Sequence, residues 1–273
     1  MELREACCVA KAPGRACEDG WVLTADFAAV VDGSTAKGTL RPEGMTTGRL
    51  AMLTVCAALR GLPAGASAGE AACFLTRALR RRCRELGIWE QALRRPEDRP
   101  TCVAVVVSRR RREAWLLGDC QLLAGGRLHS CPKPTDALLA RARADALGWL
   151  MEQGRTVDEL RADDVGRRLI FPALRDQCAF QNAGRDNPFR FTVLDGTPVD
   201  VGTVPVVSLR GCREVVLASD GYPRLLPRLG ATERALSALL RADPLCTGPL
   251  MSTKCPAPGA FSYDDRTYLR LAL

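Results

Sequence analysis

Apolar residues recur along the chain with two different spacings, and the two spacings alternate in blocks. Runs rich in Val, Leu and Ala predict strands at residues 21–31, 102–108, 113–117, 213–219 and 266–273. Helical spacing marks residues 44–60, 68–94, 135 to about 177, and 232–241. Short strands are expected between residues 189 and 207, and a hairpin around Gly125-Gly126. No repeat or long linker divides this order, so it predicts one α+β domain over residues 1–273 with a mainly antiparallel sheet.

Two of the predicted helices carry a recognisable start signal. Thr156 and Glu159 form a capping box, and so do Ser67 and Glu70. The second of these overlaps a Gly-x-Ser-x-Gly pattern at residues 65–69. A nucleophilic serine in that pattern needs a preceding strand and a histidine partner. A Gly/Pro-rich loop precedes Ser67 instead, so we interpret this serine as a helix cap.

Composition limits the classes of protein that the chain can belong to. It has 273 residues with only 5% aromatic residues, so Leu, Val and Ala must build the core. The apolar run at residues 50–59 is about half of the ~20 residues that a bilayer span needs. The first six residues include two acids and begin no signal sequence. We therefore expect a cytoplasmic protein without membrane contact.

Cysteine and histidine usage argues against two kinds of site. Thirteen cysteines are present, an odd number, and no Cys-x-x-Cys pair occurs. This pattern favours reduced thiols over a disulfide framework and excludes structural zinc of the usual spacing. The single histidine, His129, is expected in a surface loop.

The formal charge of +8 comes largely from two arginine clusters, at residues 77–84 and 109–112. In the first, arginines and apolar residues alternate with helical spacing, which is typical of a solvated face on a packed helix. The second lies between two predicted strands and is expected at a hairpin tip. Neither cluster has the aromatic residues that single-stranded nucleic acid would need, so we expect no nucleic-acid partner.

Aspartates occur where the predicted strands end. Asp32, Asp119 and Asp220 each follow an apolar strand, and Asp264 precedes the last one. In an antiparallel sheet the end of one strand and the start of its neighbour share an edge, so the four carboxylates can converge. Such a cluster repels itself unless cations neutralise it, and oxygen ligands select Mg²⁺ or Mn²⁺. The alternative is that Asp-Gly simply forms turns after strands.

Four motifs in the same order resemble those of the metal-dependent Ser/Thr protein phosphatases of the PPM (type 2C) family. Glu18-Asp19 followed by Asp32-Gly33 resembles the opening motif of the family. The run from Thr101 to Gly118-Asp119 is similar to its strand pair, Ser219-Asp220-Gly221 to its Ser-Asp-Gly motif, and Asp264-Asp265-Arg266-Thr267 to its closing motif. The set spans nearly the whole chain.

The resemblance implies a four-layer α-β-β-α sandwich in which two mainly antiparallel sheets are flanked by helices. It also implies two Mn²⁺ or Mg²⁺ ions and an accessory third, with a bridging water as nucleophile and no catalytic side chain. Asp32 would bridge the two ions, with the Gly33 carbonyl, Asp220 and Asp264 completing their shells. Asp119 would serve the third ion, and Glu18 and Asp19 would act through bound waters.

Several positions depart from the family pattern. Ser34 to Gly38 replace the usual glycine pair and cannot supply the histidine that some members have there. The phosphate-binding arginine of the family corresponds to Gly14, so neighbouring Arg15 is the candidate for this role. Asp265 replaces the final asparagine, and Lys254 is a second candidate to face the phosphate. These departures leave the substrate class open.

The sequence therefore favours a metal-dependent phosphomonoester hydrolase, acting on phosphoserine or phosphothreonine in proteins. Two alternatives stay open: a small-molecule phosphatase, and a catalytically silent PPM-like module that binds a partner or regulates one. The sequence predicts no oligomeric state.

Overall fold

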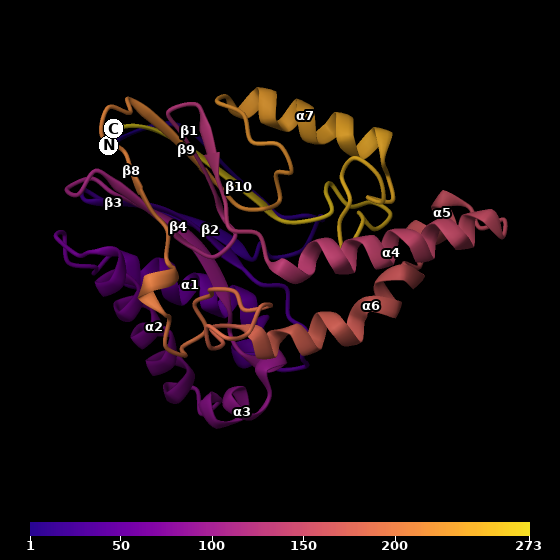
Figure 1. Ribbon diagram of the computed structural model, residues 1–273, viewed down its shortest axis with the longest axis horizontal. Helices are drawn as coiled ribbons and strands as arrows, with labels where there is room; N and C mark the ends of the chain where they lie inside the picture. Colours follow the sequence, from indigo (N-terminus) through magenta and orange to yellow (C-terminus); the bar gives the residue numbers. More distant parts are fainter.

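The computed structural model describes residues 1–273 and shows two five-stranded antiparallel sheets packed face to face (Figure 1). The first sheet has the order β1-β10-β9-β6-β7, and the second β2-β3-β4-β5-β8. The strands of the first sheet are β1 (Glu2–Val9), β10 (Arg266–Ala272), β9 (Glu214–Ala218), β6 (Gln121–Ala124) and β7 (Arg127–His129). Those of the second are β2 (Asp19–Leu23), β3 (Phe27–Gly33), β4 (Cys102–Ser108), β5 (Glu113–Leu117) and β8 (Val206–Ser208).

The continuous apolar runs become strands that are buried on both faces. Successive side chains of a strand point to opposite sides. Along β4, Ala104 and Val106 face the helices while Val103, Val105 and Val107 face the other sheet. In the first sheet, β9 behaves in the same way, with Leu217 between the sheets and Val216 outside them. Apolar side chains at every position are therefore required, which is why these strands lack polar alternation.

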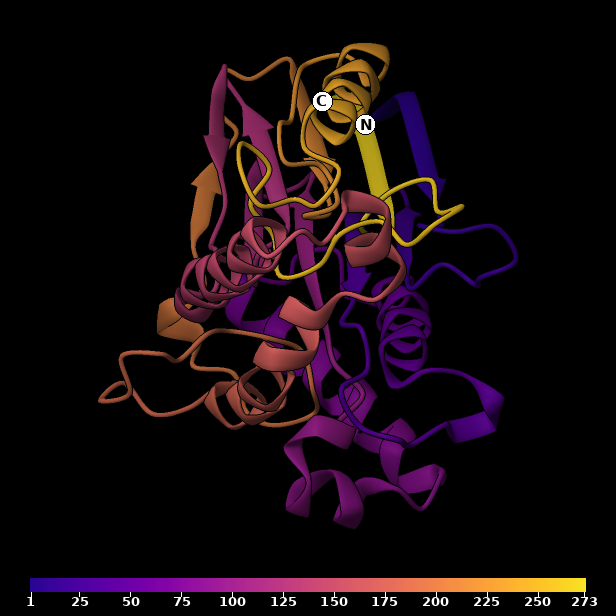
Figure 2. The same ribbon diagram turned by 90° about the vertical axis from the view of Figure 1, so that its right-hand side faces the viewer.

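Helices cover both outer faces. Helices α1 (Thr47–Leu59) and α2 (Ala68–Glu85) pack on the second sheet, and α7 (Leu229–Ala242) covers the first (Figure 1). The α3 helix (Trp89–Arg94) follows α2. Helices α4 (Pro134–Glu152), α5 (Val157–Ala162) and α6 (Val165–Asp176) extend to one side, beyond the ends of the sheets (Figures 1 and 2). Four 3₁₀ turns complete the order, at Pro42–Gly44, Pro96–Asp98, Gln177–Phe180 and Val201–Thr203. The expected α-β-β-α sandwich is confirmed.

Local expectations were met unevenly. The capping boxes at Ser67 and Thr156 are both formed. The helix expected over residues 68–94 breaks after Glu85, where Gly87 adopts a positive φ of 67°. The strands expected between residues 189 and 207 reduce to two isolated bridges and the start of β8. The region from 135 to 177 divides into three helices.

Three further features differ from the sequence expectations. The sequence pattern missed β1 entirely, because its side chains are mostly exposed or half-buried and lack a clear apolar face. His129 ends strand β7 and does not lie in a loop. Arg80 does not belong to a purely solvated face, since its guanidinium stacks over Trp89 at 5.4 Å and its Nε donates to the Gly196 carbonyl at 2.7 Å.

The cysteines form no disulfide bond. All thirteen cysteines are free thiols, and five of them are buried. None of the helices combines the length and the apolar character that a bilayer span requires.

One fully buried arginine joins the helices beside the sheets to the C-terminal part of the chain. Arg143 of α4 contacts the carboxylate of Asp164, the N-cap of α6, with its Nε 2.9 Å from Oδ2. Its NH1 donates to the carbonyls of Leu245, Cys246 and Ser252 at 2.9, 3.3 and 3.0 Å. Arg143 thereby fixes α6 and the loop before residue 254 against α4.

Replacing this residue tests its role. We expect Arg143→Met to lower the free energy of unfolding by about 3–5 kcal/mol, because Asp164 and three carbonyls lose a buried partner. Arg141→Met on the exposed side of the same helix is the control, since the Arg141 side chain is 69% exposed and pairs only with Asp145. Its expected cost is below about 0.5 kcal/mol. Urea unfolding measures both values, and equal costs would contradict the role given to Arg143.

Candidate active site

A cleft of about 440 Å³ opens where the ends of both sheets meet α4 and α6. Four of the residues lining it are the aspartates predicted from the strand ends: Asp32, Asp119, Asp220 and Asp264. Gly33 and Lys254 line it as well. The two sheets thus bring together side chains that lie more than 230 residues apart in the sequence. The turn interpretation accounts for each aspartate singly but not for their convergence.

The backbone around Asp32 is fixed by close packing. Asp32 lies near the end of β3, directly opposite Asp19 of β2 in the strand register. A Cβ atom at Gly33 would overlap the carbonyl oxygens of Gly48 and Glu18, so only glycine allows α1 to approach the end of β3 this closely. The amide of Gly33 donates to the Glu18 carbonyl at 3.0 Å. These contacts hold the Asp32 carboxylate at the floor of the cleft.

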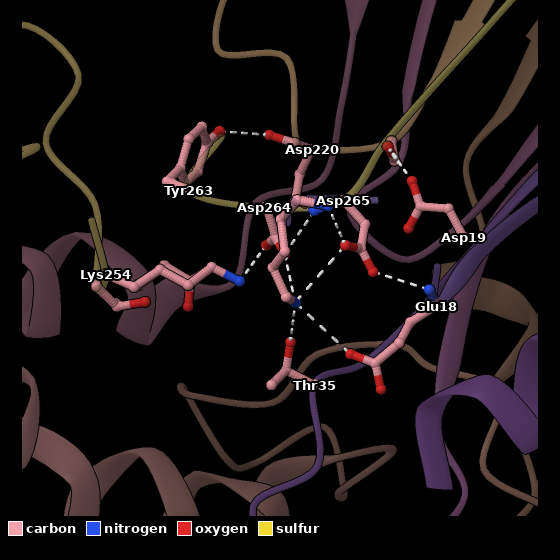
Figure 3. A network of polar contacts seen from close by, with 12 residues as sticks. Glu18, Asp19, Thr35, Asp220, Lys254, Tyr263, Asp264 and Asp265 are labelled. Carbon is pink, nitrogen blue, oxygen red and sulfur yellow. Dashed lines mark hydrogen bonds and ion pairs between the residues drawn. The ribbon is translucent and has the colours of Figure 1, made fainter. Parts of the chain in front are cut away.

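Lysines contact two of the four aspartates directly. Asp264 accepts from Lys254 and, at 3.3 Å, from the Nζ atom of Lys11 (Figure 3). Asp119 accepts from Nζ of Lys133 at 2.5 Å. Asp32 and Asp220 have no such partner within 4.0 Å. Positive charge therefore compensates one half of the acidic centre and leaves the other half uncompensated.

The pKa values follow this division. Burial, reinforced by the neighbouring carboxylates, raises the pKa of Asp32 well above its usual value. The same causes raise the pKa of Asp220 to about 6, burial being the larger. Burial also favours the protonated form of Asp264, but Lys254 and Lys11 outweigh it and lower the pKa of Asp264 to about 2. The contacts with Lys254 and Lys11 thus favour the ionised form of Asp264.

Behind the cleft, a buried network fixes the loop that precedes β2. The carboxylate of Asp265 accepts from the backbone N–H groups of Lys11 and Glu18, both at 2.8 Å (Figure 3). Asp19 accepts from the Ser219 hydroxyl at 2.6 Å. Asp265, which stands where the family has asparagine, therefore anchors the N-terminal loop with both of its oxygens.

The supporting acids lie outside the cleft lining. Glu18 accepts from the Thr46 hydroxyl at 2.5 Å and lies 3.7 Å from Nζ of Lys11. Burial raises the pKa of Asp19 well above its usual value, despite the Ser219 hydrogen bond. Neither Glu18 nor Asp19 is among the lining residues.

Of the two residues predicted to contact phosphate, one lines the cleft and the other does not. Arg15 is exposed in the loop before β2 and does not line the cleft. Lys254 does line it, but its ammonium group contacts Asp264. Four further cations lie in or beside the site and were not predicted from the sequence: Lys11, Lys37, Lys133 and Arg167. Only Lys37 had a sequence signal, its place in the altered loop after Gly33; the others come from segments whose positions only the tertiary fold defines.

The donor set suits a hard divalent ion, but its present arrangement is not closed around one. The four predicted aspartates and Asp136 line one cleft, and a cation there would offset the negative charge that raises the pKa of Asp32 and Asp220. No group of three or more His, Cys, Asp or Glu side chains is arranged to hold an ion as it stands. In this arrangement Lys133 and Lys254 contact two of the carboxylates, Asp119 and Asp264.

The uncompensated carboxylates predict how stability varies with pH when divalent ions are removed by EDTA. The pKa of Asp220 in the folded state, about 6, is above its ordinary value, so folding is favoured by protonation. We expect the free energy of unfolding to fall as the pH rises from about 5 to about 7. Asp220→Asn should lose part of that decrease. Urea unfolding at the two pH values measures it, and a stability that rises over this interval would contradict the charge distribution described here.

Scans against protein-family models and against curated proteins find no match. Among solved structures, the chain is similar to the catalytic domain of the Ser/Thr phosphatase PstP in complex with two manganese ions, at 17% identity and a TM-score of 0.48, covering 98% of this chain and 97% of that one. It is similar to the PPM Ser-Thr phosphatase MsPP from Mycobacterium smegmatis, at 17% identity and a TM-score of 0.45, with 100% of both chains covered. A Ser/Thr phosphatase from Staphylococcus aureus matches at 12% identity and a TM-score of 0.47, over 100% and 96% of the chains. At these values the function has to be argued from the residues of the cleft.

Proposed function

We propose that the protein is a metal-dependent phosphomonoester hydrolase of the PPM type, acting on phosphoserine or phosphothreonine in proteins. The observation that carries this proposal is the convergence of Asp32, Asp119, Asp220 and Asp264 in one cleft. Carboxylates that are buried or partly buried without cations are costly, and four at one place are expected only where cations neutralise them. The ordered motifs that supply these four residues resemble those of the PPM phosphatases.

Each acidic residue has a proposed task. Asp32, the Gly33 carbonyl, Asp220 and Asp264 hold two Mn²⁺ or Mg²⁺ ions, and Asp119 serves an accessory third. Such ions supply Lewis acidity that activates water and offsets the charge of the phosphoryl group. Glu18 and Asp19 support the centre from behind, where Thr46 and Ser219 fix their carboxylates by hydrogen bonds.

Neighbouring residues of the chain orient this machinery. The Tyr263 hydroxyl donates to the Asp220 carbonyl at 2.9 Å and so fixes the backbone beside the Asp220 carboxylate (Figure 3). Asp265 holds the loop that carries Lys11. We infer that residues 1–273 act as one unit, since both sheets supply ligands to the same cleft. Thirteen free thiols support a reducing compartment such as the cytoplasm.

A second candidate function is a catalytically silent module that binds a partner. The observation that favours it is the pairing of Asp119 with Lys133 and of Asp264 with Lys254, which places internal cations on two of the proposed metal ligands. In this alternative the lysines neutralise the acidic centre permanently, and the cleft serves recognition only.

Hydrolysis of p-nitrophenyl phosphate distinguishes the two functions. The enzyme proposal predicts activity with Mn²⁺ or Mg²⁺ that EDTA removes. Asp32→Asn and Asp220→Asn should each lower the rate by about 100-fold or more, since each removes a charged ligand from the centre. Circular dichroism should show both variants folded.

The matched control is Asp26→Asn at the opposite end of β3. Asp26 is 37% exposed and lies 3.9 Å from Arg110, away from the cleft. This variant should keep the activity of the wild type. Full activity in Asp32→Asn or Asp220→Asn would overturn the site assignment.

Metal binding can be tested independently of catalysis by titration calorimetry with Mn²⁺. If Lys254 competes with an ion for Asp264, Lys254→Met should bind Mn²⁺ about tenfold more tightly than the wild type, a difference of about 1.4 kcal/mol. Arg168→Met, an exposed change on α6, should leave the affinity unchanged. Absence of Mn²⁺ binding in both the wild type and Lys254→Met would support the silent module.

A further inference from the structure

The cleft is lined by cations as well as by aspartates. Four cations line it, from the loop after β3, from the start of α4, from α6 and from the loop before β10: Lys37, Lys133, Arg167 and Lys254. Two of them are paired, Lys133 with Asp119 and Asp136, and Lys254 with Asp264. The ammonium group of Lys37 and the guanidinium group of Arg167 have no carboxylate oxygen within 4.0 Å, although neither residue is fully exposed.

Lys37 is a half-buried ammonium group with unused hydrogen-bonding capacity. Its Nζ donates to the Thr35 carbonyl at 2.5 Å, which uses one of its three N–H groups. Burial, together with the nearby charges of Lys254, Arg167 and Lys133, lowers the pKa of Lys37 to about 8, burial being the largest cause. The charged form of Lys37 is therefore disfavoured in this cleft, and a bound anion would stabilise it.

Arg167 has the same character. One nitrogen of its guanidinium group, NH1, donates to the Thr253 carbonyl at 2.8 Å, and its other donors have no protein partner. Burial lowers the pKa of Arg167, and the carboxylate of Asp164 only partly opposes this effect. The backbone of Arg167 is also anchored, because its N–H donates at 2.8 Å to Asp164, which the buried Arg143 contacts in turn. A preorganised guanidinium group with free donors is suited to bind oxyanions.

We propose that Lys37 and Arg167 form an anion subsite that binds the phosphoryl oxygens of the substrate. That the anion is the substrate's phosphoryl group rests on the function proposed above. The role expected for Arg15 is thereby taken by two residues that line the cleft, as Arg15 does not. Residues 34–38 differ from the family pattern, and this loop places Lys37 in the cleft. Lys37 is therefore a cation available to the site, whereas Arg15 lies outside the cleft lining.

Solvated lysine and arginine side chains are the ordinary alternative, and the local contacts weigh against it. Both residues are anchored by a hydrogen bond to a backbone carbonyl, and both lie in the same cleft as the acidic centre. Four hydroxyl-bearing residues line the same cleft and can add neutral donors: Ser34, Thr35, Ser252 and Thr253. Two anchored cations without carboxylates, next to neutral donors, are suited to an oxyanion.

Titration calorimetry with inorganic phosphate tests the subsite, first after EDTA treatment and then with Mg²⁺. We expect the wild type to bind phosphate in both conditions. Lys37→Met and Arg167→Met should each weaken binding by about tenfold or more, since each removes a charged donor. Lys37→Arg should retain most of the affinity. Arg168→Met is the control, since Arg168 is 61% exposed and contacts Asp163, and it should bind like the wild type.

Thermal unfolding separates a binding role from a structural one. Removing an uncompensated, half-buried charge should leave the melting temperature of the free protein unchanged or raise it. The stabilisation that phosphate gives to the wild type should shrink in Lys37→Met and Arg167→Met. A lower melting temperature without phosphate, together with unchanged phosphate affinity, would assign these residues a structural role and overturn the proposal.

Phosphate binding and hydrolysis together distinguish failure of the subsite from failure of the enzyme function. Phosphate binding that depends on Lys37 and Arg167, in a protein that hydrolyses no phosphomonoester with any metal, would support the subsite and reject the enzyme. Hydrolysis with an unchanged KM in both variants would support the enzyme and reject the subsite. A wild type that binds no phosphate in either condition would also reject the subsite.

Discussion

Negative charge at the ends of buried strands is the constraint on which the rest of this structure depends. Asp32, Asp119 and Asp220 lie at or just after the ends of buried apolar strands, and Asp264 precedes β10, so all four carboxylates meet at the edge where the sheets meet α4 and α6. Burial there costs free energy unless charge is balanced. The loops and helices around this edge supply the balance.

That balance is unequal, and the inequality gives the cleft its character. Lys11, Lys133 and Lys254 hold Asp119 and Asp264 as ion pairs, while Asp32 and Asp220 face one another's charge. Two further cations, Lys37 and Arg167, stand without carboxylates. The cleft thus has an uncompensated negative region and an uncompensated positive region side by side. A phosphomonoester together with a divalent cation brings both of the missing charges at once.

Much of the fold and the acidic half of the site could be predicted from the sequence. Runs such as residues 102–108 allow only a strand buried on both sides, and an aspartate after such a run has to lie at a sheet edge. The cationic half could not be predicted. Lys11, Lys133 and Arg167 lie in segments where a lysine or arginine is ordinary, and only long-range packing turns them toward the cleft. The strand β1 was missed for a related reason: it is held by backbone pairing with β10 and not by an apolar pattern.

The position of β10 in its sheet has a consequence for how the protein forms. This strand lies between β1 and β9, so the first strand of the chain finds its only sheet neighbour some 260 residues later. Contacts between residues so far apart in the sequence form late in folding, because closing a long loop has an entropic cost. During synthesis, β1 has no strand partner until β10 has emerged from the ribosome. The hydrogen bonds from the backbone N–H groups of Lys11 and Glu18 to the Asp265 carboxylate can form only at the same stage. The nascent chain therefore has an open sheet edge and an incomplete site until β10 inserts between β1 and β9.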